Sequence, residues 1–304
     1  MDMSRSLLEA RGSSAIPMTP FDDRGRIDVN VLAREIDFIC NAKVGSVCSP
    51  VMVSEFMALS EEERKLMIQL PLEVIDGRTM FIANVAACDI NTAVRYTEFA
   101  EKCGADAVIA MAPWAGDVDA TGIEEYFRAI AAATSLPVMI QNAGLPNVAM
   151  GPERILKLCE SVENISWVKE EVPPGPVSID NLAKLRTPAL EGIMSGFAGA
   201  YAPLDFAAGA IATIHACEFC DLVQKVWDLF FADKEAEARM LHYKMMPAIQ
   251  LELLYGTRFS KEIMIRRGIF KNSYVRNKCG ALSSVAMGEI ERVWRDMIPL
   301  LETL

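Results

Sequence analysis

The sequence lacks any apolar run long enough to cross a membrane, and it has no low-complexity tract or long run of like charge. Residues 1–12 lack the apolar centre of a signal peptide. Basic residues are in the minority, since 30 lysines and arginines accompany 41 aspartates and glutamates, for a formal net charge of −11. This acidity argues against nucleic acid and anionic membranes as partners.

The glycine-rich loops that bind phosphate groups are also missing. No GxxxxGK[ST] motif occurs anywhere in the chain. The first expected strand is followed by the segment Pro-Met-Thr-Pro-Phe at residues 17–21, where a dinucleotide-binding sheet would have its glycine-rich turn. These absences argue against an open, doubly wound nucleotide-binding fold.

Eight cysteines are present, but they are scattered and lie mostly in apolar surroundings. This pattern is typical of buried, reduced thiols, and we expect a cytoplasmic protein. Cys217 and Cys220 form a CxxC motif beside His215, yet a second pair of ligands at zinc spacing is missing. We therefore assign no metal site.

Apolar runs bounded by turn residues alternate with amphipathic segments along most of the chain. The runs predict eight strands, at residues 14–18, 45–50, 79–85, 106–112, 137–141, 165–169, 189–194 and 209–214. A helical segment follows each strand, and some begin with clear signals such as the capping box at residues 60–63. This pattern predicts an α/β fold, a (β/α)8 TIM barrel over residues 1–232. Residues 233–304 show no strand signal and predict a C-terminal helical bundle packed on the barrel.

Lys169 stands at the end of the sixth predicted strand, after the apolar run Ile-Ser-Trp-Val. Burial disfavours a charged amine, and a neutral amine is the nucleophile that forms a Schiff base with a carbonyl compound. The alternative is that the side chain extends to place its ammonium in water. Because barrel active sites lie at the C-terminal ends of the strands, the predicted fold favours a catalytic Lys169.

The same rule gives further candidates at the ends of the other strands. They are Ser49, Val53, Ser54, Glu55, Asn84, Pro113, Trp114, Gln141, Asn142, Ser195, Gly196 and His215.

A series of different short motifs is distributed along the predicted barrel. They are residues 15–21 with 25–28, Ser54-Glu55 with residues 59–64, residues 104–106, Ala112-Pro113-Trp114, residues 136–138 with Asn142, residues 168–170, and Ser195-Gly196. In this order and spacing they resemble the dihydrodipicolinate synthase / N-acetylneuraminate lyase family. The resemblance implies a barrel with a C-terminal helical domain, a homo-oligomer (dimer or tetramer), and a Schiff base between Lys169 and a small 2-oxo acid. It implies no cofactor beyond that adduct.

Departures from the family pattern bear on the reaction. The family usually has Gly-Thr-Thr-Gly-Glu after the second strand, whereas this chain has Val-Met-Val-Ser-Glu at residues 51–55. The backbone N–H groups of Val53 and Ser54 could still bind a carboxylate. Gln141 replaces the tyrosine that shuttles protons in the family, and an amide is not a general acid or base. Ala115 replaces another tyrosine, and residues 143–148 lack the arginine of the synthases, which argues against dihydrodipicolinate synthesis.

Gln141, Phe56 and the Lys-x-Glu-x-Pro pattern at residues 169–173 resemble the 2-keto-3-deoxy sugar acid dehydratase branch, such as L-2-keto-3-deoxyarabonate dehydratase. This implies that Lys169 condenses with C2, a base removes a C3 proton, and the C4 hydroxyl leaves. Gln141 and Asn142 are expected to orient hydroxyls or water. His215 and Glu55 are the candidates for proton transfer.

Several alternatives stay open at this point. His215 could be a hydrogen-bonded structural histidine, Glu55 could hold its loop through backbone hydrogen bonds, and Trp114 could belong to the core rather than to the substrate pocket. The alternative reaction is a pyruvate-releasing aldolase of the N-acetylneuraminate lyase type. The alternative of another class is a non-catalytic 2-oxo acid sensor.

Overall fold

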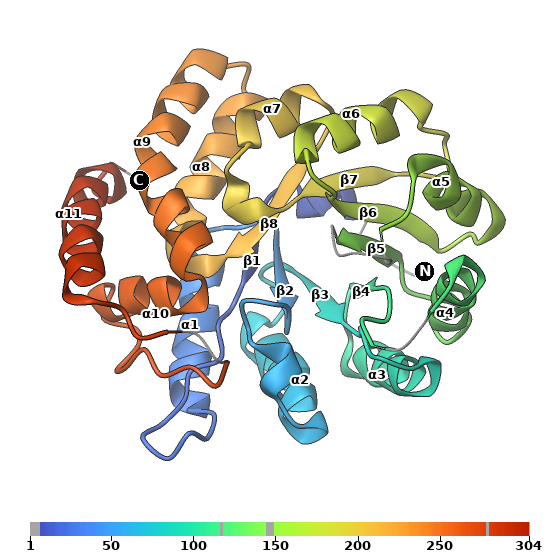
Figure 1. The fold of residues 1–304 in the computed structure, drawn as a ribbon, viewed down its shortest axis with the longest axis horizontal. Coiled ribbons are helices and arrows are strands. Elements are labelled where there is room, and N and C mark those ends of the chain that lie inside the picture. Colours follow the sequence, from blue (N-terminus) through green and yellow to red (C-terminus); the bar gives the residue numbers. More distant parts are fainter. Residues whose placement is uncertain (1–6, 116–117, 144–148, 278–279, 304) are drawn as a thin grey trace.

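The computed structural model describes residues 7–115, 118–143, 149–277 and 280–303. Eight parallel strands close into a barrel in sequence order, with β1 paired to both β2 and β8 (Figure 1). The strands are β1 (Gly12–Ile16), β2 (Ser46–Ser49), β3 (Met80–Asn84), β4 (Ala107–Met111), β5 (Val138–Ala143), β6 (Ile165–Glu171), β7 (Gly192–Ser195) and β8 (Ala212–Ala216). The predicted (β/α)8 barrel is confirmed.

A helix follows each strand and covers the outside of the barrel. These helices are α1 (Val29–Asn41), α2 (Glu61–Ile75), α3 (Ile90–Cys103), α4 (Ala120–Ala132), α5 (Pro152–Ser161), α6 (Gly175–Leu185), α7 (Ala202–Ala207) and α8 (Cys220–Phe231). The predicted capping box is present at α2: Ser60 Oγ accepts from the N–H of Glu63 at 3.2 Å, and the Glu63 carboxylate accepts from the N–H of Ser60 at 2.9 Å.

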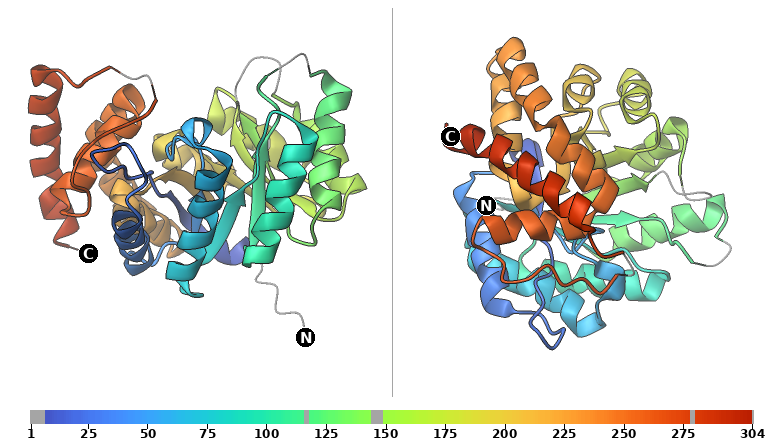
Figure 2. Two further views of the ribbon diagram at one scale, coloured as in Figure 1. Left: turned by 90° about the horizontal axis from the view of Figure 1, so that it is seen from below. Right: turned by 60° about the vertical axis from the view of Figure 1, so that its left-hand side comes forward.

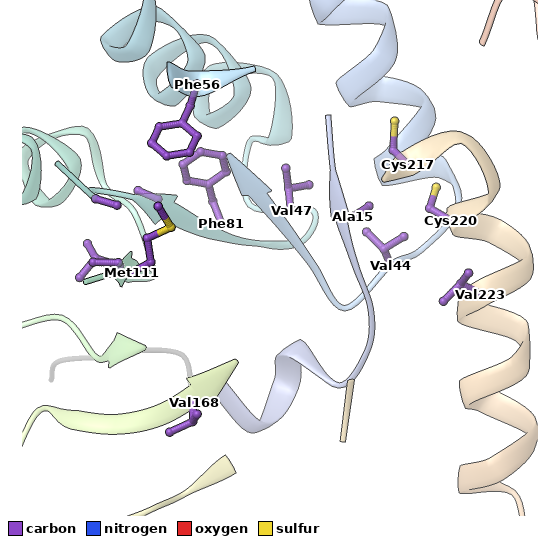
Figure 3. Packing of buried hydrophobic residues seen from close by; sticks show 14 of the residues in the cluster. Ala15, Val44, Val47, Phe56, Phe81, Met111, Val168, Cys217, Cys220 and Val223 are labelled. Carbon is purple, nitrogen blue, oxygen red and sulfur yellow. The ribbon is translucent and has the colours of Figure 1, made fainter. Parts of the chain in front are cut away.

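Side chains alternate along the strands between two apolar clusters. The cluster inside the barrel includes Met139 and Trp167. The outer cluster, between strands and helices, includes Val168 (Figure 3). Gly192 makes room for Trp167, because a Cβ there would lie 2.0 Å from the indole ring. Since successive strand residues face opposite sides, a buried Trp167 fixes Lys169 on the inward face of β6.

Three helices follow the barrel and lie at one side of it (Figures 1 and 2). They are α9 (Glu235–Tyr255), α10 (Thr257–Arg266) and α11 (Ser284–Leu301). The first and the last of them contact α8, and the middle one contacts the first helix and the turn after β8. The outer apolar cluster includes residues of both parts, such as Trp227 and Phe259. The helical nature of the C-terminal part is confirmed, while its division from the barrel at residue 232 stays a prediction. None of the described helices combines the length and apolarity needed to cross a membrane.

Candidate active site

A cavity of about 250 Å³ lies at the C-terminal ends of the strands, beside Lys169. Its wall includes Val53, Gln141, Glu171 and His215. Larger hollows, among them two of about 510 and 720 Å³, are lined by residues at the ends of the helices and in the segments that precede the strands, at the opposite end of the barrel. Because barrel enzymes place their chemistry at the C-terminal end, we assign the smaller cavity as the candidate site.

Lys169 pairs with a carboxylate inside this cavity. Its side chain is buried, with 4% of the residue exposed, so it does not extend to bulk water. Its Nζ lies 2.9 Å from Oε2 of Glu171. The same oxygen accepts a hydrogen bond from Nε2 of Gln141 at 2.8 Å. Glu171 is thus held between the amine and the amide that occupies the position of the family tyrosine.

The expectation that Lys169 closes the sixth strand was wrong. Strand β6 continues to Glu171, which lies two residues further and therefore on the same face as Lys169. The intervening Glu170 faces the other way, and its carboxylate accepts from Nδ2 of Asn142 at 2.8 Å. Burial raises the pKa of Glu170.

Gly196 leaves the space that the Glu171 carboxylate occupies. A Cβ at position 196 would lie 2.0 Å from Oε1 of Glu171, well inside van der Waals contact. The next two residues, Phe197 and Ala198, both have left-handed backbones, with φ of 53° and 56°, and both line the cavity. Such conformations cost roughly 1–3 kcal/mol each and gather at functional sites.

His215 also lines the cavity but is fully enclosed, with 3% of the residue exposed. Its Nε2 lies 2.8 Å from Oγ of Ser13. Burial lowers the pKa of His215 to about 4, so the imidazole is neutral at pH 7. A neutral, hydrogen-bonded ring is a poor source of protons for a leaving group at that pH.

The side chains of two predicted site residues, Asn142 and Ser54, point away from the cavity and bond elsewhere. Asn142 bonds to the backbone of Met150 and to Glu170, because it follows the inward-facing Gln141 on β5. The hydroxyl of Ser54 donates to the carbonyl of Pro17 at 2.6 Å. These contacts do not support side-chain roles for Asn142 and Ser54 at the substrate.

Trp114 packs edge-on against Phe56 at 5.4 Å between ring centroids, and it is not among the residues that line the cavity. Contact with the core is one of the two roles expected for it. Residues 144–148, part of the segment that lacks the arginine of the synthases, lie outside the described residues.

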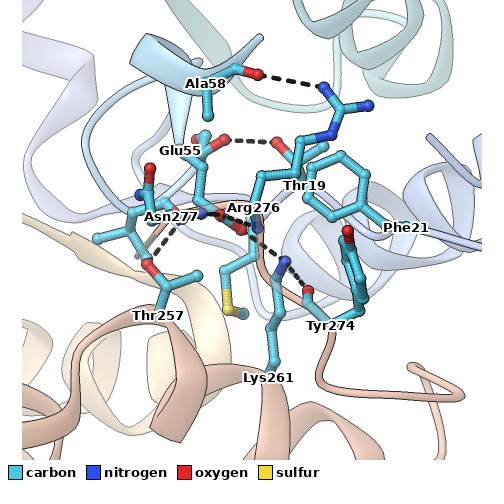
Figure 4. Close-up of polar contacts among 12 residues, drawn as sticks. Thr19, Phe21, Glu55, Ala58, Thr257, Lys261, Tyr274, Arg276 and Asn277 are labelled. Carbon is cyan, nitrogen blue, oxygen red and sulfur yellow. Dashed lines mark hydrogen bonds and ion pairs between the residues drawn. The ribbon is translucent and has the colours of Figure 1, made fainter. Parts of the chain in front are cut away.

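Glu55 is the centre of a buried polar cluster that joins the loop after β2 to the C-terminal segment (Figure 4). One oxygen of Glu55 lies 2.8 Å from Nζ of Lys261. The other accepts from the backbone N–H groups of Arg276 and Asn277 at 2.7 and 2.8 Å. This geometry supports the interpretation that Glu55 holds its loop in place through hydrogen bonds from backbone N–H groups. The donors belong to the C-terminal segment and not to the loop itself.

The sequence pattern missed two kinds of cavity residue. Glu171 carried a signal, the Lys-x-Glu spacing on a strand, which places both side chains on one face. Glu252 and Ser260 also line the cavity, but they come from α9 and α10, which follow the barrel. No strand-end rule could have found them.

The CxxC segment is not placed for redox chemistry. Cys217 and Cys220 are buried, and burial raises the pKa of both thiols well above the ordinary value. The Sγ of Cys217 donates to Glu35 at 3.2 Å. Both thiols therefore stay protonated, and protonated thiols are poor nucleophiles and metal ligands.

A model of the dihydrodipicolinate synthetase family matches residues 9–293. The chain belongs to this family. Solved structures with the same fold include the 4-hydroxy-tetrahydrodipicolinate synthase of Methylacidiphilum fumariolicum SolV, with a TM-score of 0.88, 22% identity, and coverage of 96% of this chain and 97% of that one. The dihydrodipicolinate synthase of Rhodopseudomonas palustris gives a TM-score of 0.86 at 23% identity, over 95% and 98%.

Relatives within the dihydrodipicolinate synthetase family differ in the reaction they are named for. The 4-hydroxy-tetrahydrodipicolinate synthase of Bacillus subtilis is 30% identical over 158 residues, about half of each chain (52% of this one and 54% of the relative). The L-2-keto-3-deoxyarabonate dehydratase of Azospirillum brasilense is 24% identical over 302 residues, 98% of each chain. Family members are lyases and synthases that act through a lysine Schiff base, and this chain is an enzyme of that class.

Proposed function

We propose that this enzyme dehydrates a 2-keto-3-deoxy sugar acid through a Schiff base on Lys169. The observation that carries the proposal is the position of Glu171, whose carboxylate contacts both Lys169 Nζ and the Gln141 amide. A base beside the imine nitrogen is also close to C3 of the bound acid, because C3 is two bonds from that nitrogen. The proposed chemistry uses no cofactor.

The residues perform separate parts of the reaction. Glu171 accepts a proton from the Lys169 ammonium, and the free amine adds to C2 of the 2-oxo acid. Glu171 then returns that proton to the departing hydroxyl, so that water leaves, the iminium forms and Glu171 is again a carboxylate. The iminium acidifies C3, whose proton passes to a base; we assign Glu171 to this step. The electron pair of the C3–H bond then forms an enamine, which expels the C4 hydroxyl. Hydrolysis of the imine returns Lys169 and the dehydrated product.

The substrate carboxylate requires hydrogen-bond donors at the cavity wall. Val51, Met52 and Val53 all line the cavity, so the backbone of this loop lies beside the substrate space. We assign the N–H groups of Val53 and Ser54 to the carboxylate of the substrate. Gln141 is held by Glu171 and cannot titrate, so its role is to fix the Glu171 carboxylate rather than to transfer protons.

The replacement of the family tyrosine by Gln141 favours dehydration over synthase or aldolase chemistry. An amide at this position cannot relay the proton that a tyrosine relays. A dehydratase that aligns with 98% of this chain agrees with that assignment, although the identity is 24%. A pyruvate-releasing aldolase is the alternative reaction, and a non-catalytic sensor is the alternative without chemistry.

Borohydride trapping tests the Schiff base directly. The wild-type chain is reduced with borohydride in the presence of pyruvate, and the expected result is a covalent pyruvate adduct on the peptide that contains Lys169. Lys169→Ala should give no adduct, whereas Lys157→Ala, on the exposed face of α5, should react like the wild type. Absence of an adduct in the wild-type chain would reject the proposal and favour the sensor.

Product analysis separates the two enzymatic reactions. Incubation with L-2-keto-3-deoxyarabonate should give an uncleaved dehydrated product with all its carbons. Release of pyruvate with an aldehyde would instead assign the aldolase reaction. Both products can be followed by NMR of the reaction mixture.

We also propose that the enzyme is a homo-oligomer that works in a reducing cytosol. Exposed apolar side chains that suit association include Tyr201, Leu204, Tyr243 and Leu254. The seven described cysteines are free thiols, which suits a reducing compartment. Light scattering on the eluting protein should give the mass of a dimer or tetramer, and a monomer mass would reject the association.

A further inference from the structure

Glu252 lies on α9, outside the barrel strands, yet it lines the same cavity as Lys169 and Glu171. Its carboxyl faces that of Glu218, which follows β8 in the 3-10 turn Cys217–Phe219. Ser260, another residue of the cavity wall, donates its hydroxyl to Oε1 of Glu218 at 2.8 Å. Two carboxyl groups are therefore in contact at the side of the cavity formed by the C-terminal helices.

The environment of this pair retains a proton. Glu218 is 1% exposed, and its Oε2 has no hydrogen-bond partner within the described part of the chain. The carboxyl group of Glu252 lies within hydrogen-bonding reach of the Glu218 carboxyl group. Two ionised carboxylates in contact would repel, so one of them stays protonated. Burial, and then the charge of Glu218, raise the pKa of Glu252 well above its ordinary value. Burial raises the pKa of Glu218 as well, while its hydrogen bonds and the charge of Arg267 oppose that shift.

The proposed dehydration needs an acid that is distinct from the base. Once Glu171 holds the C3 proton, the C4 hydroxyl can leave as water only if another group protonates it. Gln141 does not titrate, and His215 is neutral and bonded to Ser13. Glu252 is the remaining titratable side chain that the described cavity wall offers.

We propose that Glu252 is the general acid for the departing hydroxyl, with Glu218 as its positioning residue. This inference rests on the dehydration proposed above. The proton moves from the Glu252 carboxyl to the C4 oxygen as the C4–O bond breaks, and the enamine electron pair becomes the C3–C4 double bond. Water leaves, and Glu252 is a carboxylate until solvent returns a proton to the pair.

Two measurements on Glu252→Gln separate acid catalysis from a structural role. The first is dehydration of L-2-keto-3-deoxyarabonate, and the second is exchange of the C3 hydrogens of pyruvate with deuterium in D₂O, which needs the Schiff base and Glu171 but no leaving group. We expect dehydration to fall by about 10²- to 10³-fold while exchange stays near the wild-type rate. Glu237→Gln, an exposed change on the same helix, should alter neither rate.

Dehydration that continues at the wild-type rate in Glu252→Gln would overturn the inference. Equal loss of exchange and dehydration would also overturn it, because that result means that the cavity has collapsed. Glu218→Gln provides an independent readout, since removing the neighbouring charge should shift the pH at which dehydration is lost to lower values. An unshifted pH profile would contradict the assignment of Glu218 as the positioning residue of Glu252. A wild-type chain that exchanges pyruvate but dehydrates nothing would instead reject the dehydration itself, and the acid with it.

Discussion

Glu171 is the residue whose charge the proposed chemistry needs most. Its Oε2 lies 2.9 Å from Lys169 Nζ and 2.8 Å from Gln141 Nε2. Glu171→Gln keeps the size of the side chain but removes the base. We expect exchange of the C3 hydrogens of pyruvate to fall by about 10²- to 10⁴-fold, the range typical of a lost general base. NMR in D₂O measures this rate directly.

Glu170→Gln is the matched control for that change. Glu170 is adjacent on β6 but faces the outer side, where it contacts Asn142 and the N–H of Val172. The Glu170→Gln enzyme should exchange the C3 hydrogens of pyruvate at a rate close to that of the wild type. A Glu171→Gln enzyme that exchanges as fast as this control would show that the base is another group.

Gly196→Ala tests whether the position of Glu171, and not only its charge, matters. A Cβ at this position would lie 2.0 Å from Oε1 of Glu171, so the carboxylate must move away from Lys169. We expect a loss of exchange that approaches that of Glu171→Gln, with the midpoint of thermal unfolding little changed because the side chain can rotate. Wild-type exchange in the alanine variant would mean that Glu171 acts from a different position.

Sequence reasoning at the residue scale found Lys169, because a lysine after an apolar run is rare and chemically costly. It missed Glu171 because the predicted sixth strand ended at Lys169, two residues before the end of β6. The prediction for Asn142 followed from its position at a strand end, yet a single step along β5 turns its side chain outward. A strand end can be located to within a residue or two, and an error of one residue reverses the face.

Among the elements, α10 and the segment after it hold the loop that follows β2. The buried pair between Lys261 and Glu55 links them at 2.8 Å. Lys261→Met would leave the Glu55 carboxylate buried with its two backbone donors, at a cost of about 3 kcal/mol in the free energy of unfolding. Because Val51, Met52 and Val53 line the cavity, KM should rise as well. Urea unfolding and steady-state kinetics measure the two effects.

Lys271→Met provides the comparison for that change. Lys271 pairs with Asp28 at 3.1 Å, but it is exposed, so its loss should alter stability by less than about 1 kcal/mol and leave KM unchanged. If Lys261→Met destabilised the chain without any change in KM, the loop would not depend on this contact for its position.

The elements themselves were predictable, since the strands and helices carry their own periodicity and several helices begin with a capping side chain. Asp28, Ser60 and Asp89 each accept a hydrogen bond from the first turn of a helix, which is a signal local to the chain. The contribution of α9 and α10 to the cavity was not predictable in this way. It depends on how the C-terminal helices pack against the barrel, which places Glu252 at the cavity that Lys169 also lines.

For the whole molecule, pH should act on stability through buried groups with opposite shifts. Burial raises the pKa of Glu35 from 4.5 to about 8, against the opposing hydrogen bonds from Cys217 and the N–H of Met18 and the charge of Lys261. Between these two values the folded chain binds one more proton than the unfolded chain, so the free energy of unfolding falls as pH rises. Burial lowers the pKa of His215 from 6.5 to about 4, which has the opposite effect. Between these two values the unfolded chain binds the additional proton, so the free energy of unfolding falls as pH drops.

The effect of Glu35 on stability can be measured between pH 6.5 and 8, because this range lies below its folded-state pKa and above the interval in which His215 acts. Asp205, whose pKa burial raises to about 6, completes its transition near the lower end of this range and contributes equally to both chains compared below. We therefore expect the wild-type free energy of unfolding to decline from pH 6.5 to 8. Glu35→Gln keeps an oxygen to accept from Met18 and Cys217 but cannot ionise, so its curve should be flatter over this range. Urea unfolding at a series of pH values measures both curves, and equal slopes would contradict a buried, neutral Glu35.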